Sequence, residues 1–206
     1  MYLIGCLPKK DDFQHSFIWD YNSAYPIAEI ANALSSDVAY TSFEADGKGN
    51  WTIPSYTPNS IEARTGKLSY SLSSGAISKA GLVLNRKYVI SFWAKTGATV
   101  SLNGSSVIPT LDPAINSWEY YETSLTGSPT VTSATISGTG TIDELRLFPE
   151  GAQMTTYTFS PSIGMTSATD ANNVKTYFEY DVLGRLATVK DDQGKILKTY
   201  KYNYKQ

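Results

Sequence analysis

The sequence predicts an all-β fold, and three observations point to it. Tyr, Thr and Ser are abundant, with 15 Tyr against 3 Met, a composition that favours strands over helices. Short apolar runs recur about every 10–15 residues and are separated by turn-forming residues. Hydrophobic residues make up 41% of the 206 residues, enough to form a core. We therefore expect one domain of about 110–150 residues with smaller parts attached.

Composition divides the chain into three zones. Residues 1–40 carry an aromatic cluster, residues 41–150 hold the short apolar runs, and residues 151–206 are rich in Tyr, Lys and Asp. Because helical patterns are missing between its strands, the middle zone is expected to form a two-sheet sandwich or jelly roll. A helix is expected only near Ile27–Leu34.

The middle zone contains six expected strands. They cover Lys67–Leu72, Tyr88–Lys95, Thr99–Leu102, Trp118–Leu125, Val131–Ser137 and Thr141–Phe148. Asn103-Gly104 is typical of a two-residue hairpin turn. In the second strand every other residue shares a face, with Phe92 on one side and Trp93 on the other. The pattern leaves open which of these faces is the core.

The third zone repeats itself at an offset of 22 residues. Residues 166–181 align with residues 188–203, and each unit is a turn followed by an alternating strand. The aligned pairs include Asp170 with Asp192 and Tyr180 with Tyr202. Such units bury little alone and need neighbours.

A degenerate copy of this unit lies in the first zone. Residues 19–22 match residues 178–181, and residues 27–30 then fall on residues 186–189 without a gap. The sandwich therefore has repeat material on both flanks. We expect the N-terminal flank to pair with the C-terminal hairpins.

Residues 180–186 read YDVLGRL and are followed by Val189 and Asp191. This string resembles the YD (RHS-type) repeat, and the resemblance covers about 40 residues, from Gly164 to Tyr204. It implies β-hairpin units of large bacterial surface or secreted proteins, of the kind found in Bacteroidetes-type bacteria. Two units are too few to form the closed shell of full-length members.

The middle zone resembles jelly-roll carbohydrate-binding modules. The residues that carry this likeness are Ser42–Glu44, Ala63–Ser69, Tyr88–Lys95, Trp118–Tyr121 and Ile142–Leu147. The fold hosts many functions, so the resemblance implies the sandwich more directly than it implies a ligand.

Modules of this type often hold a structural calcium ion where the first and last strands meet. The resemblance places Glu44, Asp143 and the carbonyl of Lys67 at such a site, with Asp46 as a spare carboxylate, and calcium takes six to eight oxygen ligands. The alternative is that Glu44 and Asp143 are ordinary acids at strand ends.

Sugar binding is the second expectation, because aromatic faces stack on the apolar face of a pyranose ring. The candidate side chains are Trp51, Tyr56, Trp93, Trp118 and Tyr121. The alternative for each is core packing. Trp51 and Tyr56 lie in a loop rich in Gly and Pro, where exposure is expected.

Catalysis finds little support in the sequence. His15 is the single histidine, Cys6 is the single cysteine, and neither metal-ligand spacing nor a nucleophile motif is present. Adjacent acids such as Asp143-Glu144 point to opposite faces of a regular strand and would not face each other across a cleft. We expect a protein without enzymatic activity.

Charge and hydropathy argue against two classes of partner, nucleic acid and the interior of a membrane. Charged residues are 17% of the chain, the formal net charge is −2, and no basic tract stands out, which argues against nucleic acid. No apolar run approaches the length that spans a bilayer. Residues 3–6 resemble the end of a lipoprotein signal, but the segment before Cys6 is too short for one.

The expected function is therefore a cell-surface or secreted module that binds a glycan or cell-wall polysaccharide, with any export signal outside this sequence. One alternative is a structural spacer that binds no small ligand. Another is a module that binds a protein partner through an exposed strand edge.

Overall fold

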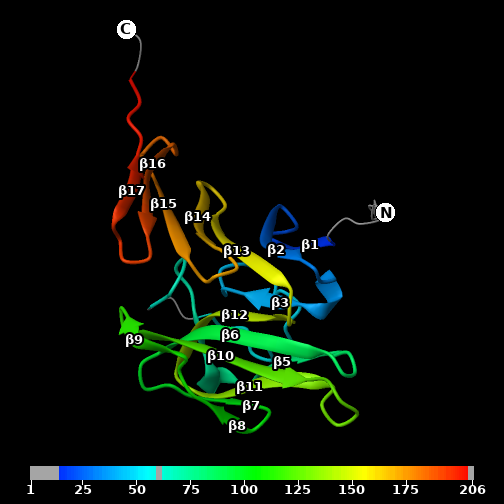
Figure 1. Cartoon of the computed structure of the whole chain (residues 1–206). Coiled ribbons are helices and arrows are strands. Elements are labelled where there is room, and N and C mark those ends of the chain that lie inside the picture. The colour runs from blue at the N-terminus through cyan, green and yellow to red at the C-terminus, as the bar shows by residue number, and fades with distance from the viewer. Residues whose placement is uncertain (1–13, 59–61, 204–206) are drawn as a thin grey trace.

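The computed structural model describes residues 14–58 and 62–203, which form three layers of antiparallel strands (Figure 1). Cys6 lies outside the described residues. A seven-stranded sheet holds, in spatial order, β1 (His15–Asp20), β2 (Tyr25–Ala31), β13 (Gln153–Ser160), β14 (Gly164–Thr169), β15 (Lys175–Tyr180), β16 (Leu186–Asp191) and β17 (Ile196–Thr199).

The other two layers form the sandwich. One sheet holds β3 (Ala39–Thr41), β12 (Thr141–Pro149), β6 (Lys87–Lys95), β10 (Trp118–Thr126) and β9 (Leu111–Ile115), with β4 (Tyr70–Ser71) also paired to β12. The other holds β5 (Ile77–Ala80), β11 (Ser133–Thr139), β7 (Thr99–Leu102) and β8 (Ser105–Val107). The short 3₁₀ helices are η1 (Ser35–Asp37) and η2 (Leu72–Ser74). Within the described residues, no helix has the length and apolar character needed to cross a bilayer.

The expected all-β sandwich is confirmed. Its main core lies between the two smaller sheets and includes Phe43, Ile90, Phe92 and Ile136, all without exposed surface. Five of the six expected strands are present, with ends that differ by at most two residues, whereas only Tyr70–Ser71 of the expected strand Lys67–Leu72 is a strand. The sequence pattern missed the short strands β3, β5, β8 and β9, because three to five residues show little alternation.

Both faces of strand β6 are covered, which is why its alternating pattern did not reveal which face is the core. Tyr88, Ile90, Phe92 and Ala94 belong to the sandwich core. On the other face Trp93 is only 3% exposed, because the third layer lies over it. A strand buried on both faces shows no polar side.

The N-terminal flank is a β-hairpin that packs on the outer face of the sandwich. β2 pairs with β13, as expected for a flank that joins the C-terminal hairpins. Ile18, Ile30 and Met154 of this layer form a second core with Val38 and Tyr40. The helix expected near Ile27–Leu34 is wrong, since this segment begins within strand β2; bulge formation at Ile27 had shifted the apolar spacing toward a helical period.

Three successive turns in the C-terminal repeats share one geometry. In each, an Asp side-chain Oδ1 accepts hydrogen bonds from the backbone N–H groups two and four residues later, at distances of 2.8–3.0 Å. These residues are Asp170, Asp181 and Asp191. The residue three positions after each Asp has a positive φ and is Asn173, Gly184 or Gly194, as tight turns require.

The turn geometry corrects the repeat alignment. Asp170 corresponds to Asp191, at an offset of 21, and not to Asp192. The strand ends keep the offset of 22, which relates Tyr180 to Tyr202. These two residues play the same part, since Tyr180 Oη donates to the Met165 carbonyl and Tyr202 Oη donates to the Leu186 carbonyl. A bulge in β17 supplies the extra residue.

The N-terminal hairpin departs from this pattern. Its turn places Tyr21, Asn22 and Ser23 at positive φ, and Asp20 Oδ1 accepts from the N–H groups of Tyr21 and Gly47. The hairpin therefore lies where the degenerate copy was expected but lacks the aspartate turn of the repeats.

Candidate functional site

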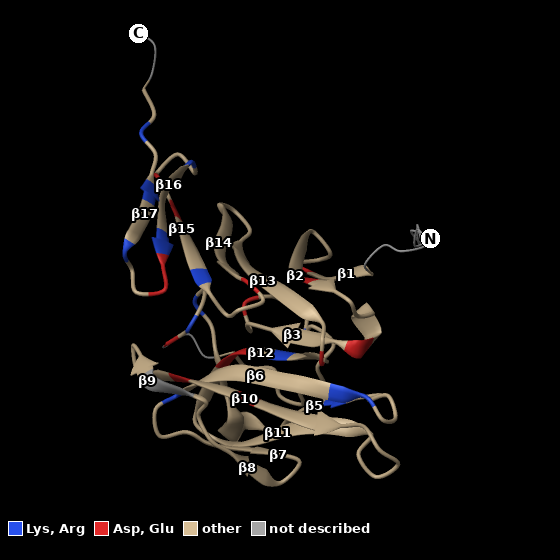
Figure 2. Cartoon of the chain, in the orientation of Figure 1, with Lys and Arg blue, Asp and Glu red and all other residues tan. Residues whose placement is uncertain are grey.

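Strand β12, in the sandwich sheet next to the seven-stranded sheet, carries both acidic and basic residues (Figure 2). The pairing of β12 with β6 shifts register between Asp143 and Arg146, and Glu144 has a φ of 55°. This bulge turns two consecutive acids toward the outer layer, whereas a regular strand would separate them. Asp143 is fully buried and Glu144 is 2% exposed.

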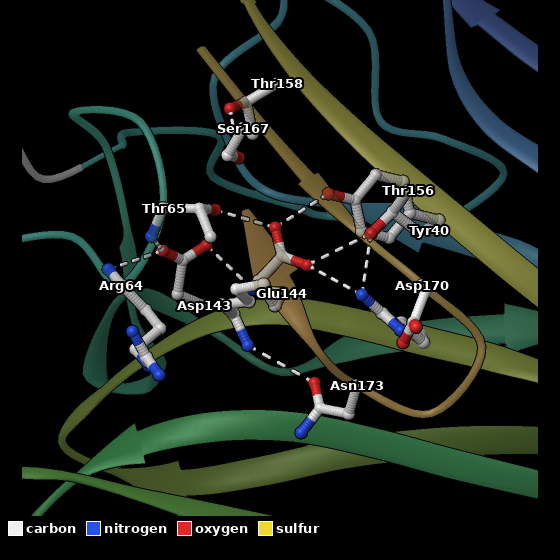
Figure 3. Close-up of polar contacts among 12 residues, drawn as sticks. Tyr40, Arg64, Thr65, Asp143, Glu144, Thr156, Thr158, Ser167, Asp170 and Asn173 are labelled. Carbon is white, nitrogen blue, oxygen red and sulfur yellow. Dashed lines mark hydrogen bonds and ion pairs between the residues drawn. The ribbon is translucent and has the colours of Figure 1, made fainter. Parts of the chain in front are cut away.

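Asp143 is held by backbone donors. Its Oδ2 accepts from the N–H groups of Arg64 and Thr65 at 2.7 and 3.0 Å, and its Oδ1 accepts from that of Glu144 at 2.7 Å (Figure 3). Burial, and then the charge of Glu144, raise the pKa of Asp143 well above its usual value. A neutral Asp143 beside an ionised neighbour is the arrangement expected for two adjacent buried acids.

Glu144 joins the sandwich to the outer layer. Its Oε1 accepts from Tyr40 Oη at 2.8 Å and Thr65 Oγ1 at 2.7 Å, and its Oε2 accepts from Arg146 at 3.0 Å and from Thr156 of β13 at 3.2 Å (Figure 3). Burial alone would raise the pKa of Glu144, but Arg146 and Lys175 lower it. The ionised carboxylate therefore bonds groups from three strands and one loop.

Two cations lie on the ring of Trp93. The guanidinium carbon of Arg64 is 4.1 Å from the ring centroid and Lys175 Nζ is 4.3 Å from it. Lys175 belongs to β15 and is 1% exposed. Burial lowers the pKa of Lys175 to about 7. Cations over an indole face are attracted by its quadrupole, so Trp93 packs against the repeats.

Arg64 makes the principal polar contact between the sandwich and the repeats. Its guanidinium donates to Tyr177 Oη at 3.0 Å and forms an ion pair with Asp192, and Tyr177 Oη donates back to the Arg64 carbonyl at 2.9 Å. Its side chain is 3% exposed. Because Asp191 fills the turn position, Asp192 is free to make this ion pair.

A cleft of about 1320 Å³ opens beside this contact. We call it the junction cleft. It is bounded by the N-terminal hairpin turn (residues 21–25), the sandwich loop at residues 63–67, the end of β13 and the hairpin turn at residues 190–194. All three zones of the chain contribute to its lining.

Aromatic rings form one side of the junction cleft. The rings of Tyr25 and Phe159 are stacked at 4.7 Å between centroids, and Tyr21 contacts both edge-on at 5.8 and 6.0 Å. Tyr21 Oη also donates to the Phe159 carbonyl at 3.1 Å. All three side chains are half-buried, and we call them the aromatic wall. Pockets with aromatic faces and a few polar groups suit organic ligands.

Carboxyl groups lie next to the aromatic wall. Glu44 and Asp46 line the cleft, and Asp20 lies behind Asp46. Burial raises the pKa of Asp20, and the carboxyl of Asp46 raises it further. Burial, followed by the charges of Glu44, Asp20 and Asp46, raises the pKa of Tyr21 to about 12. These acids are therefore close enough to the aromatic wall to act on the same ligand.

The structure places most of the expected sugar-binding aromatics below the surface. Trp51 is 4% exposed, Trp93 and Trp118 are 3% exposed, and Tyr121 is 2% exposed. Tyr121 stacks on Phe92 in the sandwich core at 5.0 Å. Of these four, Trp118 lines the junction cleft, with Lys95 Nζ 5.2 Å from its ring centroid, and the other three are not among the lining residues.

Tyr56 is half-buried and donates from Oη to the Ala45 carbonyl at 2.8 Å. Lys48 Nζ lies 6.0 Å from its ring centroid. Tyr56 therefore supports the loop that carries Glu44 and Asp46.

The expected calcium ligands are engaged with N–H donors. Glu44 Oε1 accepts from the backbone N–H groups of Lys67, at 2.6 Å, and Leu68, and the oxygens of the Asp143 carboxyl accept from three backbone N–H groups. In the two described ranges, no group of three or more His, Cys, Asp or Glu side chains is placed to hold a metal ion. Calcium bound by Glu44, Asp143 and the Lys67 carbonyl therefore stays a prediction.

Sequence reasoning missed the aromatic wall. Tyr21 and Tyr25 belong to the aromatic cluster of the first zone, but Phe159 comes from the third, and no local pattern links segments 138 residues apart. The pairing of β2 with β13 brings them together. The one usable signal was the expectation that the two flanks pair.

No protein-family model matches the chain, and no curated protein sequence matches it. Among solved structures, the chain is similar to the CBM22-1 xylan-binding domain of Paenibacillus barcinonensis Xyn10C. The identity is 16% and the TM-score is 0.39, over 57% of this chain and 97% of that domain. At this identity the likeness concerns the fold alone.

Proposed function

We propose that the chain is a non-catalytic glycan-binding module of a secreted or cell-surface protein, and that its sugar site is the junction cleft. The observation that carries the proposal is the aromatic wall of Tyr21, Tyr25 and Phe159 beside hydrogen-bonding side chains. Half-buried rings next to carboxylates offer a sugar both an apolar face and acceptors for its hydroxyl groups.

The junction cleft differs from the site expected on the sandwich alone. Its lining joins the N-terminal hairpin to the sandwich loop and the repeats, so a sugar bound there would contact all three zones. Such a site is complete only when the outer layer is docked on the sandwich. Arg64, with its bonds to Tyr177 and Asp192, supports that docking.

A glycan array followed by titration of each hit tests the proposal. Phe159→Ala removes a ring of the aromatic wall and is expected to weaken binding at least tenfold, about 1.4 kcal/mol. Trp19→Ala is the matched control, because Trp19 is 54% exposed and is not among the lining residues of the cleft. Equal losses in both variants, or no sugar bound by the intact chain, would contradict the proposal.

A structural role as a spacer is the second candidate. The shared aspartate turns at Asp170, Asp181 and Asp191 favour it, and they also support the assignment of the third zone to YD-type repeats. A spacer is expected to bind no glycan on the array and to show the same melting temperature with and without sugars or calcium.

A further inference from the structure

The lining of the junction cleft is richer in acids than in bases. The acids are Glu44, Asp46, Glu179, Asp191 and Asp192, and the bases are Arg64, Lys67 and Lys190. Two of these bases form ion pairs with acids of the lining: Arg64 pairs with Asp192, and Lys190 pairs with Glu179 at 2.5 Å. Both pairs lie on the side of the cleft that the repeats form.

On the opposite side of the cleft Lys67 is the one lining base among the described residues, and it stands against the two carboxyl groups of Glu44 and Asp46. Glu44 uses Oε1 for two backbone N–H groups, and Oε2 has no hydrogen-bond donor among residues 14–58 and 62–203. Asp46 lies against the buried carboxyl of Asp20, which is itself bonded to Gly47 N–H at 2.9 Å. Burial and the neighbouring carboxyl of Asp46 raise the pKa of Asp20, and Glu44 and Asp46 are the acids that face the cleft on this side.

The same acids act on the aromatic wall. The charges of Glu44, Asp20 and Asp46 all bear on the hydroxyl of Tyr21. Tyr21 is in edge contact with Tyr25 and Phe159. A ligand on these rings would therefore meet π faces and carboxylates at the same time. Cations are the ligand groups that both features attract.

We propose that the junction cleft prefers glycans whose sugars carry free ammonium groups, such as deacetylated amino-sugar chains, and disfavours chains of uronic acids. This proposal rests on the proposed function, since it names the ligand class of the same cleft. The pyranose faces would lie on the aromatic wall, and an ammonium group would lie beside Asp46 and Glu44. An N-acetyl group removes the charge, and a uronate replaces it with one that the acids repel.

Calorimetric titration with three soluble oligosaccharides of equal length tests this ligand class. The probes are glucosamine oligomers, their N-acetylated counterparts and oligogalacturonate, in slightly acidic buffer of low ionic strength. The glucosamine oligomer is expected to bind at least about tenfold more tightly than the acetylated one, as a charge pair near a protein surface allows. Asp46→Asn should remove most of that difference. Glu150→Gln, which changes an exposed carboxylate outside the cleft lining, should leave it intact.

The outcomes separate the two proposals. Equal affinity for the glucosamine and acetylated oligomers, or tightest binding of oligogalacturonate, overturns the ligand class and leaves glycan binding intact. No binding of any probe and no hit on the array overturns both. A preference for ammonium that Asp46→Asn does not change overturns the placement in this cleft. If Asp46→Asn lowers the melting temperature, rising salt serves instead, since it should weaken binding of the glucosamine oligomer alone.

Discussion

Arg64 offers the sharpest test of how the repeats are held on the sandwich. Arg64→Ala removes the ion pair with Asp192, the hydrogen bond to Tyr177 and the stacking on Trp93. Deleting one partner of a buried ion pair costs about 3–5 kcal/mol, because the other charge is left unpaired. Asp192 keeps 20% of its side-chain surface exposed, so water compensates part of the loss. We therefore expect a loss near the lower limit, about 3 kcal/mol.

Urea denaturation followed by tryptophan fluorescence measures this loss, and hydrogen exchange shows where it acts. Exchange should accelerate in β15, which contains Tyr177, and in β16, which ends next to Asp192, more than in the sandwich strands. The control is Lys87→Ala, which breaks the pair with Glu150 at side chains that are 47% and 57% exposed; a surface pair contributes about 0–1 kcal/mol. Similar small losses in both variants, with unchanged exchange in the repeats, would refute the reasoning.

Three further predictions concern the same regions. Burial lowers the pKa of Lys175 to about 7 in the fold, against 10.5 for a solvent-exposed lysine. Between these two values the unfolded chain binds more protons, so the free energy of unfolding rises with pH. Relative to Lys175→Met, the intact chain should gain about 1.4 kcal/mol per pH unit above about pH 7 in urea titrations; a constant difference would contradict a buried amine that loses its proton. Gly66→Ala should cost about 1–3 kcal/mol in thermal unfolding, since Gly66 has a φ of +62° and an added Cβ would lie 2.3 Å from the Glu44 carboxyl carbon. Gly184 has a φ of +74°, but an added Cβ would have no close neighbour, so Gly184→Ala should destabilise the fold less than Gly66→Ala. A larger loss for Gly184→Ala would contradict the role of the Glu44 contact. Asp191→Ala should cost about 1 kcal/mol and speed exchange in β16 and β17, whereas Asp191→Asn keeps the acceptor that bonds Gln193 and Lys195 and should cost less; equal effects would show that the turn does not depend on that acceptor.

The strands of the sandwich could be predicted because their pattern is local. Tyr88–Lys95 alternates over nearly its whole length, and β6 runs from Lys87 to Lys95. The Asn103-Gly104 turn was equally readable, and both residues adopt positive φ between β7 and β8. Bulges are the main source of error, because one inserted residue breaks the period. The bulge at Ile27 hid strand β2, and the one in β17 shifted the repeat alignment.

The site was harder to predict, because its residues come together only through tertiary pairing. Composition marks Trp93 and Trp118 as candidates for sugar binding, but it does not reveal that the repeats cover one and that the other is 3% exposed. Likewise, the alternation rule separates Asp143 from Glu144, and only the bulge with Glu144 at positive φ turns both toward the outer layer. Two sequence expectations do bear on the site: the pairing of the two flanks and the aromatic cluster that contains Tyr21.

Chemical-shift mapping of the isotope-labelled chain with a bound oligosaccharide tests the central claim most directly. Sugar binding in the junction cleft should shift the signals of Tyr21, Tyr25 and Phe159 together with those of the Gly66 loop and the Gln193 turn. Shifts confined to the sandwich strands or to the exposed face of β17, or no shifts with a sugar that binds on the array, would contradict the account.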